Sequence, residues 1–288
     1  MGKLFKNLKP YWKSVLVIVV LLVVQAFCDL SLPQYTSDII DTGIQNSGVE
    51  HILPEKITAE EFQNAQLFMT ADEQKTWQDA YSGDGDLLDR NDFSKKDLEQ
   101  FDSDLIVPIL LNYQMSMMSE DGFREMLMQQ QQGNPQAAEQ LKTMSIADIG
   151  KSMGVTLTPF ERTEEDDDGN ETTVTCVDVR PLFAAMQEAG QFTEETRSEM
   201  RSQLETMLDT MGESLVQSMG IAYAVQCDQA AGLDTDKIQT NYLWAAGGKM
   251  IAIAFAMMAV TICISYVAAR VGAGVARDLR KKVFSRVM

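Results

Sequence analysis

The chain has 288 residues, a net charge of −18 and only one histidine, so a histidine-dependent catalytic site would rest on His51 alone. Its length allows one large domain or two ordinary ones. The charge is unevenly distributed: residues 1–13 carry +4 and residues 268–288 carry +5, which leaves −27 for the residues between them. A single soluble globule has no need of two basic ends around an acidic middle.

The first 13 residues alternate lysines with apolar and aromatic side chains, in the order "KLFKNLKPYWK" from Lys3 to Lys13. This pattern predicts an amphipathic cytoplasmic helix over residues 1–13, lying in the inner headgroup layer of a membrane. The simpler alternative is a positively charged flank without a defined structure.

An apolar run from Val15 to Leu32 has Asp29 as its only charged residue. It predicts a transmembrane helix that continues as an amphipathic extension, together covering residues 14–48. Pro33 is expected to kink this helix because proline lacks a backbone N–H. Asp29 is costly in lipid, so it is expected either to face a protein interior or water-filled cavity, or to be hydrated near the outer interface.

A second apolar run, from Met250 to Ala269, has no charged residue and predicts a transmembrane helix over residues 238–270. The alternative for both runs is a buried core helix. The basic residues beside each run predict that both termini are cytoplasmic and that residues 49–237 are extracellular, in a multi-pass protein of the plasma membrane. Residues 271–288 are expected to continue the second helix into the cytoplasm as an amphipathic rod.

Residues 49–237 have the composition of a folded, mostly helical domain with a core of its own. Thr58 with Glu61 and Thr70 with Glu73 fit the capping box that begins a helix. A β-hairpin is predicted within residues 154–179, where β-branched residues flank an acidic turn. The methionines of this segment are interpreted as core residues rather than as a ligand surface. Helices are predicted at 59–68, 71–81, 95–118, 120–131, 135–143, 180–189 and 193–218.

Two of the four cysteines, Cys28 and Cys263, lie in the predicted spans. Cys176 and Cys227 lie in the predicted extracellular segment, where oxidation is permitted. The sequence leaves two alternatives open for this pair, a disulfide bond or two buried thiols.

No motif for catalysis, cofactor binding or metal binding is found, and no nucleic-acid partner is expected. The acidic clusters at 84–100 and 164–171 do not have the EF-hand spacing, so they are interpreted as solvated turns. The stretch "AAGGKMI" at 245–251 lacks the first glycine and the hydroxyl residue of a phosphate-binding loop. This chain is therefore not expected to hydrolyse a nucleotide.

Four stretches together resemble a known family. They are "LKPYWKSV" (8–15), "FCDLSLPQYTSDIIDTGI" (27–44), "DTDKIQTNYLWAAGGKM" (234–250) and "GAGVARDLRKKVF" (272–284). They are similar to the elbow helix and the first two transmembrane helices of bacterial ABC exporters of the multidrug type, in which one chain carries both permease and ATP-binding domain. The resemblance covers residues 1–48 and 233–288.

The resemblance implies a mainly α membrane protein: an elbow helix and two long transmembrane helices that flank a mostly helical extracellular domain with a small β-hairpin. The insertion of about 190 residues is larger than the ordinary loop of the family. The chain is expected to end before the coupling helix, so the nucleotide-binding domain, with its ATP and Mg²⁺, would lie outside it.

By the same resemblance, the partners are the lipid bilayer, a downstream ATP-binding domain and a second half-transporter, in a homodimer or a heterodimer. Asp29, Asp38 and Asp41 are candidates for lining the translocation path near its outer mouth. The alternative is a two-span membrane receptor with an extracellular sensing domain.

Overall fold

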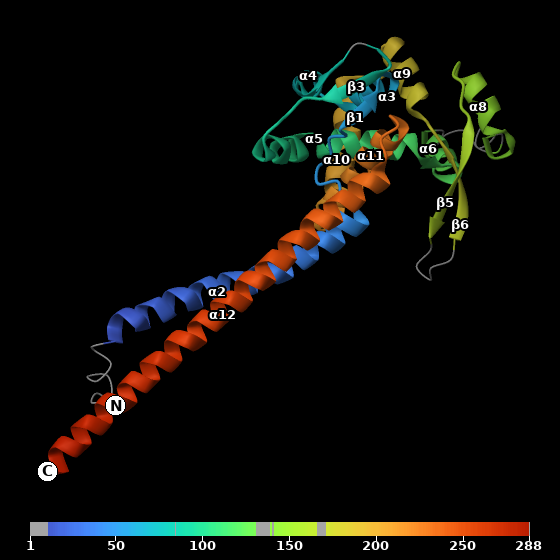
Figure 1. Ribbon diagram of the computed structural model, residues 1–288. Coiled ribbons are helices and arrows are strands. Elements are labelled where there is room, and N and C mark those ends of the chain that lie inside the picture. Colours follow the sequence, from blue (N-terminus) through green and yellow to red (C-terminus); the bar gives the residue numbers. More distant parts are fainter. Residues whose placement is uncertain (1–10, 84, 131–138, 140, 166–170, 288) are drawn as a thin grey trace. The chain divides into compact units, whose positions relative to one another are not determined.

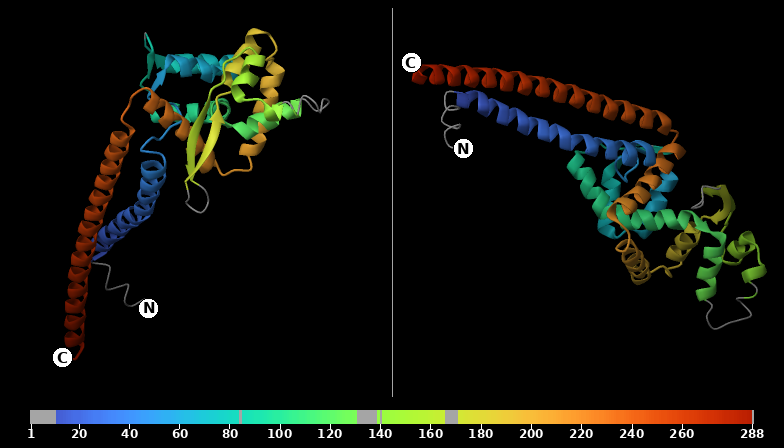
Figure 2. Two further views of the ribbon diagram at one scale, coloured as in Figure 1. Left: turned by 90° about the vertical axis from the view of Figure 1, so that its right-hand side faces the viewer. Right: turned by 90° about the horizontal axis from the view of Figure 1, so that it is seen from below.

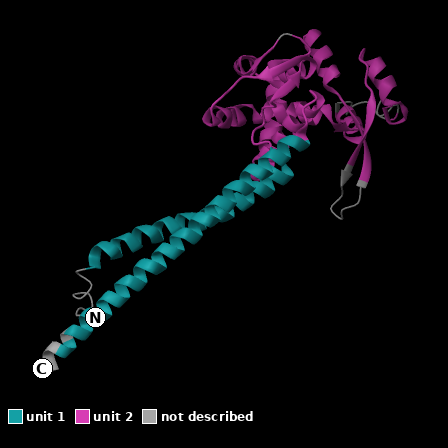
Figure 3. Ribbon diagram, viewed as in Figure 1, with its two compact units in different colours: residues 1–48, 236–288 teal, residues 49–235 magenta. Residues whose placement is uncertain are grey.

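The computed structural model describes residues 11–83, 85–130, 139, 141–165 and 171–287. The chain divides into two compact units (Figure 3). Unit 1 comprises residues 1–48 and 236–288, and unit 2 comprises Val49–Thr235. The division falls within two residues of the domain boundaries expected at 49 and 237. Most of the expected elbow helix, residues 1–10, lies outside the described residues.

Unit 1 consists of long helices (Figure 1). Helix α2 runs from Trp12 to Asp38 and continues as a π-helix, η2, over Ile39–Gln45. Helix α12 runs without a break over Thr235–Val287, 53 residues, which is about 80 Å of helix. The predicted second span and the predicted cytoplasmic rod are therefore one helix.

The apolar surfaces of these helices are not covered by the rest of the chain. The segments Trp12–Gln45 and Thr235–Lys281 have mean hydropathies of 2.7 and 2.3 in their most apolar windows, and none of either window is buried inside the protein. By length and composition, both helices could cross a membrane. A core helix of a soluble domain would bury much of this surface, and within the described residues the apolar windows of these two helices bury none of it.

Unit 2 is mostly helical, with two small sheets. Its elements in chain order are β1 (Lys56–Thr58), α3 (Ala59–Ala65), η3 (Gln66–Phe68), α4 (Ala71–Ala80), β2 (Tyr81–Ser82), β3 (Leu87–Arg90), α5 (Lys95–Ser116), β4 (Met118–Ser119), α6 (Glu120–Gln130), α8 (Ile146–Ser152), β5 (Pro159–Glu165), β6 (Glu171–Val177), α9 (Arg180–Glu188), α10 (Glu194–Leu208) and α11 (Glu213–Ala230).

The predicted β-hairpin is confirmed. Strands β5 and β6 pair antiparallel, with Phe160 opposite Cys176, and β4 adds a third strand beside β6. The acidic turn at 166–170 lies outside the described residues. The second sheet, with the strand order β1–β3–β2, was not predicted, because strands of two to four residues carry no readable alternation.

Most predicted helices are present, with two corrections. The helix predicted at 193–218 is two helices, α10 and α11, because the chain leaves the helical conformation after Leu208 and begins again with Gly212 at the N-cap. Helix α8 was missed, although Ser145 caps it by accepting a hydrogen bond from the backbone N–H of Asp148 at 3.2 Å. The helix predicted at 135–143 falls largely outside the described residues.

Helix α5 joins two hydrophobic clusters in unit 2. Leu110 and Leu111 belong to a cluster with Phe68 and Phe123, whereas Leu105 and Ile109 pack in a second cluster around Trp77. Burying each such side chain contributes about 1.5–3 kcal/mol to folding. The core interpretation of the methionines holds for those that pack in or against the first cluster, which are Met115, Met118, Met126, Met144, Met186, Met200, Met211 and Met219. Met153 and Met207 are exposed.

A close contact between α5 and α11 depends on Gly220. A Cβ atom at this position would lie 2.6 Å from Cδ1 of Ile106 and 2.7 Å from Cγ2 of Ile52. Both distances are shorter than carbon atoms tolerate, so a side chain here would displace the side chains of Ile106 and Ile52.

We therefore expect Gly220→Val to destabilise unit 2 by about 1–3 kcal/mol, as overpacking of a core does. The measurement is urea unfolding of the full chain followed by fluorescence of Trp77, which is fully buried, in a Trp12→Phe, Trp244→Phe background. Ala222→Val, at an exposed position of the same helix, is the matched control. Equal midpoints for the two variants would contradict the close contact.

Candidate functional site

The three carboxylates predicted to line a translocation path do not form a cluster. Asp29 is exposed on α2, Asp38 is half-buried at the end of α2, and Asp41 is exposed in η2. Asp41 accepts a hydrogen bond from the hydroxyl of Ser37 at 2.8 Å. Two of the three residues are therefore accessible from outside the chain, and the role predicted for them stays a prediction.

Pro33 lies inside α2, which continues to Asp38. Because proline has no N–H, the carbonyl of Asp29 lacks its usual helical partner. The helix widens into η2 only after Asp38, and α2 changes direction along its length (Figure 2). Local departures from α-helical geometry of this kind accompany bends in long helices.

The C-terminal end of η2 packs closely against the first turns of α12 and is hydrogen-bonded to them. The amide of Gln239 donates a hydrogen bond to the carbonyl of Gly43 at 2.8 Å. A Cβ at Gly43 would lie 2.7 Å from Cδ2 of Leu243. Gly48 has φ +80°, and a Cβ there would lie 2.9 Å from Cα of Gln239. The two glycines thus allow the two segments to approach closely.

The other end of α2 also contacts α12. The hydroxyl of Tyr11 donates to Oδ2 of Asp278 at 3.0 Å. A Cβ at Gly274 would lie 2.5 Å from that same hydroxyl oxygen. Along each helix the two contact regions are separated by about 50 Å, which exceeds the 30 Å or so of a hydrocarbon core. Both apolar runs lie between them.

Cys176 and Cys227 are not joined by a disulfide. Both are buried thiols, one on β6 and the other on α11. Burial, followed by the negative charge of Glu61, raises the pKa of Cys227 well above its usual range. This thiol is therefore neutral and behaves as a small apolar side chain. Of the two alternatives, the structure has the buried thiols.

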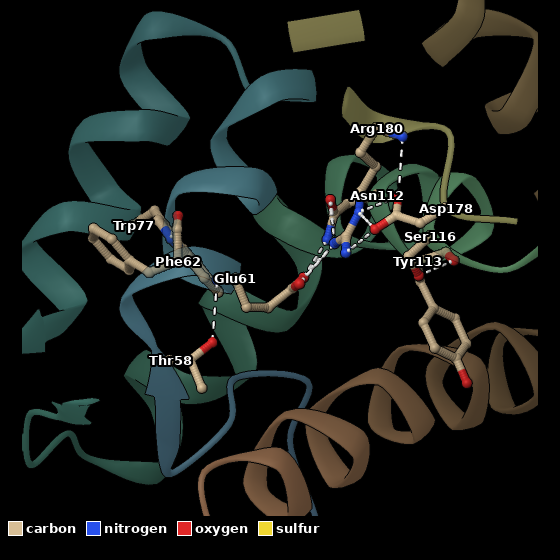
Figure 4. A network of polar contacts seen from close by, with 9 residues as sticks. All are labelled: Thr58, Glu61, Phe62, Trp77, Asn112, Tyr113, Ser116, Asp178 and Arg180. Carbon is tan, nitrogen blue, oxygen red and sulfur yellow. Dashed lines mark hydrogen bonds and ion pairs between the residues drawn. The ribbon is translucent and has the colours of Figure 1, made fainter. Parts of the chain in front are cut away.

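A polar network that was not predicted from the sequence lies inside unit 2 (Figure 4). At its centre is Arg180, the first residue of α9, whose side chain is 9% exposed. Nη1 donates to both carboxylate oxygens of Glu61, at 2.7 and 2.8 Å. Nε and Nη2 donate to Asp178, at distances from 2.8 to 3.2 Å. The network links α3, α9 and the residues just before α9.

Asn112 of α5 completes the network. It is fully buried, donates from Nδ2 to Glu61 at 2.8 Å and accepts from Nη1 of Arg180 at 3.3 Å. Burial alone would lower the pKa of Arg180, but its hydrogen bonds to Asp178 and the charge of Glu61 raise it above its usual value. The guanidinium is thus permanently charged, and all of its nitrogens are engaged.

The same contacts explain why one predicted capping box is incomplete. The backbone N–H of Glu61 donates to the hydroxyl of Thr58 at 3.2 Å, as predicted. The Glu61 carboxylate does not accept a hydrogen bond from the backbone N–H of Thr58, because it is bound by Arg180 and Asn112. The capping box at Thr70 and Glu73 is confirmed, because the side chain of each residue accepts a hydrogen bond from the backbone N–H of the other.

A pocket of about 390 Å³ lies beside this network. It is lined by Thr58, Glu60, Glu61, Asn64, Ser116, Met117, Phe160, Asp178, Arg180, Tyr223, Gln226, Cys227 and Ala230. Its volume is near the lower end of the range of small-molecule sites, about 300–1,000 Å³. A few polar groups and an apolar wall are the usual composition of such sites.

Two buried side chains of α11 have polar atoms without a hydrogen-bond partner among the described residues. They are the hydroxyl of Tyr223, which lines the pocket, and Oδ2 of Asp228. The other carboxylate oxygen of Asp228 accepts from the backbone N–H of Lys56 at 2.8 Å. Burial raises the pKa of Tyr223 well above its usual range and raises the pKa of Asp228 to about 6.

Together these features define a mainly helical chain in which two long apolar helices flank, in sequence, a globular unit that contains a pocket. No protein-family model, curated protein or solved structure matches the chain. The resemblance to ABC exporters therefore rests on the sequence motifs alone.

Proposed function

We propose that this chain is the membrane-spanning N-terminal portion of an ABC-type exporter. In this proposal α2 and α12 cross the membrane, both ends of the chain are cytoplasmic, and unit 2 is extracellular. The chain contributes to the substrate path and transmits ATP-driven motion from a nucleotide-binding domain that it does not contain. ATP and Mg²⁺ would be bound by that domain.

The observation that carries the proposal is the continuity of α12. Its apolar part, with no residue buried in the most apolar window, passes without a break into the basic stretch that holds Arg277, Arg280 and Lys281. A single helix of this length can pass a displacement at one end to the other without absorbing it in a loop. Exporters need such rods because their ATPase domains move outside the membrane.

The exposed apolar surface supports the partners in the proposal. Large side chains along both helices, such as Phe27, Leu30, Phe255 and Ile262, are more than 60% exposed. Lipid covers part of such a surface, and further transmembrane helices, including those of a second half-transporter, cover the rest. Asp29 then faces those helices or a water-filled path, since a lipid-facing carboxylate is costly.

The pocket in unit 2 favours a second candidate function, a two-span receptor with an extracellular sensing domain. Ligand binding to unit 2 would then be the input, and α12 would carry the signal into the cell. The two candidates differ in the cytoplasmic module that they require.

The two candidates are distinguished by an antibody against unit 2, used on membranes of the cells that make the protein. We expect the immunoprecipitate to hydrolyse ATP and vanadate to inhibit this hydrolysis, because an ABC exporter traps vanadate with ADP at its ATPase site. Antibody saturated beforehand with purified chain is the control. A precipitate that contains a histidine kinase or chemoreceptor module and no vanadate-sensitive hydrolysis would support the receptor instead.

A further inference from the structure

The pocket beside Arg180 has a charge that selects among ligands. Its charged lining comprises three carboxylates, Glu60, Glu61 and Asp178, and one guanidinium, which gives a formal charge of −2. Arg180 has little to offer an anion, because Nε, Nη1 and Nη2 all donate to Glu61 or Asp178 and only the second hydrogen of Nη2 is left over. An anionic ligand would therefore meet the repulsion of three carboxylates with at most one compensating hydrogen bond from Arg180.

Glu60 is the carboxylate that the chain leaves available. It is exposed in the first turn of α3, and no ion pair joins it to another described residue. Glu61 and Asp178, in contrast, are held by Arg180. A cation in the pocket would gain an unshared partner in Glu60 without breaking the network.

The remaining wall is suited to an apolar body with one polar end. Met117, Phe160 and Ala230 supply apolar surface, and the neutral thiol of Cys227 adds to it. The hydroxyl of Tyr223 is buried, and its oxygen accepts no hydrogen bond from a described residue, so it is a built-in acceptor. A buried oxygen that accepts no hydrogen bond is unfavourable, and an N–H donor on a ligand would reduce this penalty.

We propose that this pocket binds a small organic ammonium compound, a primary amine that is protonated at neutral pH and attached to an apolar or aromatic body. Glu60 supplies the counter-charge, and the hydroxyl of Tyr223 accepts one ammonium hydrogen. The site lies wholly in unit 2, so it holds for the exporter and for the receptor. In an exporter the site would capture the ammonium compound or regulate transport in response to it. In a receptor the site would sense the compound.

The test is isothermal titration calorimetry on the full chain in phosphatidylcholine nanodiscs, with the heat of empty nanodiscs subtracted. Three probes of similar size and different charge are used: phenethylammonium, 2-phenylethanol and 3-phenylpropionate. We expect saturable binding of phenethylammonium, at least about fivefold weaker binding of the neutral alcohol, and no binding of the anion. Equal affinity for all three probes, or a preference for the anion, would overturn the proposal.

Two variants locate the binding. Glu60→Gln and Tyr223→Phe are each expected to weaken phenethylammonium binding by about fivefold, since each removes one partner of the ammonium group. Glu99→Gln, an exposed carboxylate of α5 outside the pocket, is the control and should leave binding unchanged. Both variants should remain folded, because Glu60 is exposed and Tyr223→Phe keeps the buried ring and removes only its oxygen. Unchanged affinity in both would contradict the proposed site.

Discussion

Replacing Arg180 with alanine is expected to destabilise unit 2 by about 3–5 kcal/mol, the usual effect of breaking a buried ion pair from one side. The loss arises because Glu61 and Asp178 would keep their charges without Arg180 as a partner. The side-chain oxygen of Asn112 would also lose the hydrogen bond that it accepts from Arg180. The free energy of unfolding is measured by urea titration of the full chain, with Trp77 as the fluorescent probe in the Trp12→Phe, Trp244→Phe background.

Two further variants keep this prediction testable if Arg180→Ala does not fold. Arg180→Lys retains the charge but cannot form the forked contacts, so we expect a smaller loss. The double variant Glu61→Gln, Arg180→Met removes both charges of the closest pair and should recover part of the stability. Lys96→Ala, at an exposed position of α5, should change it by less than about 0.5 kcal/mol. A loss below 1 kcal/mol in Arg180→Ala would show that the network is not a stabilising feature.

The second large effect is a dependence of stability on pH that arises from Asp228. Its carboxyl is fully buried, and burial raises its pKa from 3.8 to about 6. The folded state thus holds this proton at a higher pH than the unfolded chain does. The stabilising contribution of protonated Asp228 is therefore fully present below pH 3.8 and is lost as the pH rises to about 6. Above that pH, the loss amounts to about 3 kcal/mol.

Asp228→Asn removes this titration while retaining an oxygen that can accept from the backbone N–H of Lys56. At pH 7 we expect the variant to be more stable than the wild type by up to about 3 kcal/mol, and near pH 3.5 we expect the difference to vanish. Subtracting the two curves cancels other groups, such as Glu73, whose pKa is lowered mainly by its contacts with Arg201 and Thr70 against the effect of burial. Asp79→Asn, an exposed position of α4, should give no such pH dependence.

The parts of this protein that could be predicted from sequence are those encoded in adjacent residues. The apolar runs specify α2 and α12 because hydropathy is read locally, and the capping box at Thr70 is visible because its two members are three residues apart. The hairpin of β5 and β6 was predicted for the same reason, from β-branched runs on both sides of an acidic turn.

The polar network could not be read in this way, because Glu61, Asn112 and Arg180 are separated by 51 to 119 residues along the chain. One local signal existed. Arg180 is the first residue of a helix, a position where the helix dipole disfavours positive charge. A basic residue there suggests a carboxylate partner, but it does not say which of the 42 acidic residues supplies it. The thiols of Cys176 and Cys227 likewise depend on tertiary packing, which the cysteine count does not contain.

The most direct test of the central claim is the side of the membrane on which each part of the chain lies. Ser214→Cys in unit 2 and Ala276→Cys in α12 both place a thiol at an exposed position. On intact spheroplasts, a membrane-impermeant maleimide should label the first variant and should label the second only after permeabilisation, with the wild-type chain as background. Labelling of both positions only after permeabilisation, or recovery of the chain in the soluble fraction, would contradict the two-span arrangement.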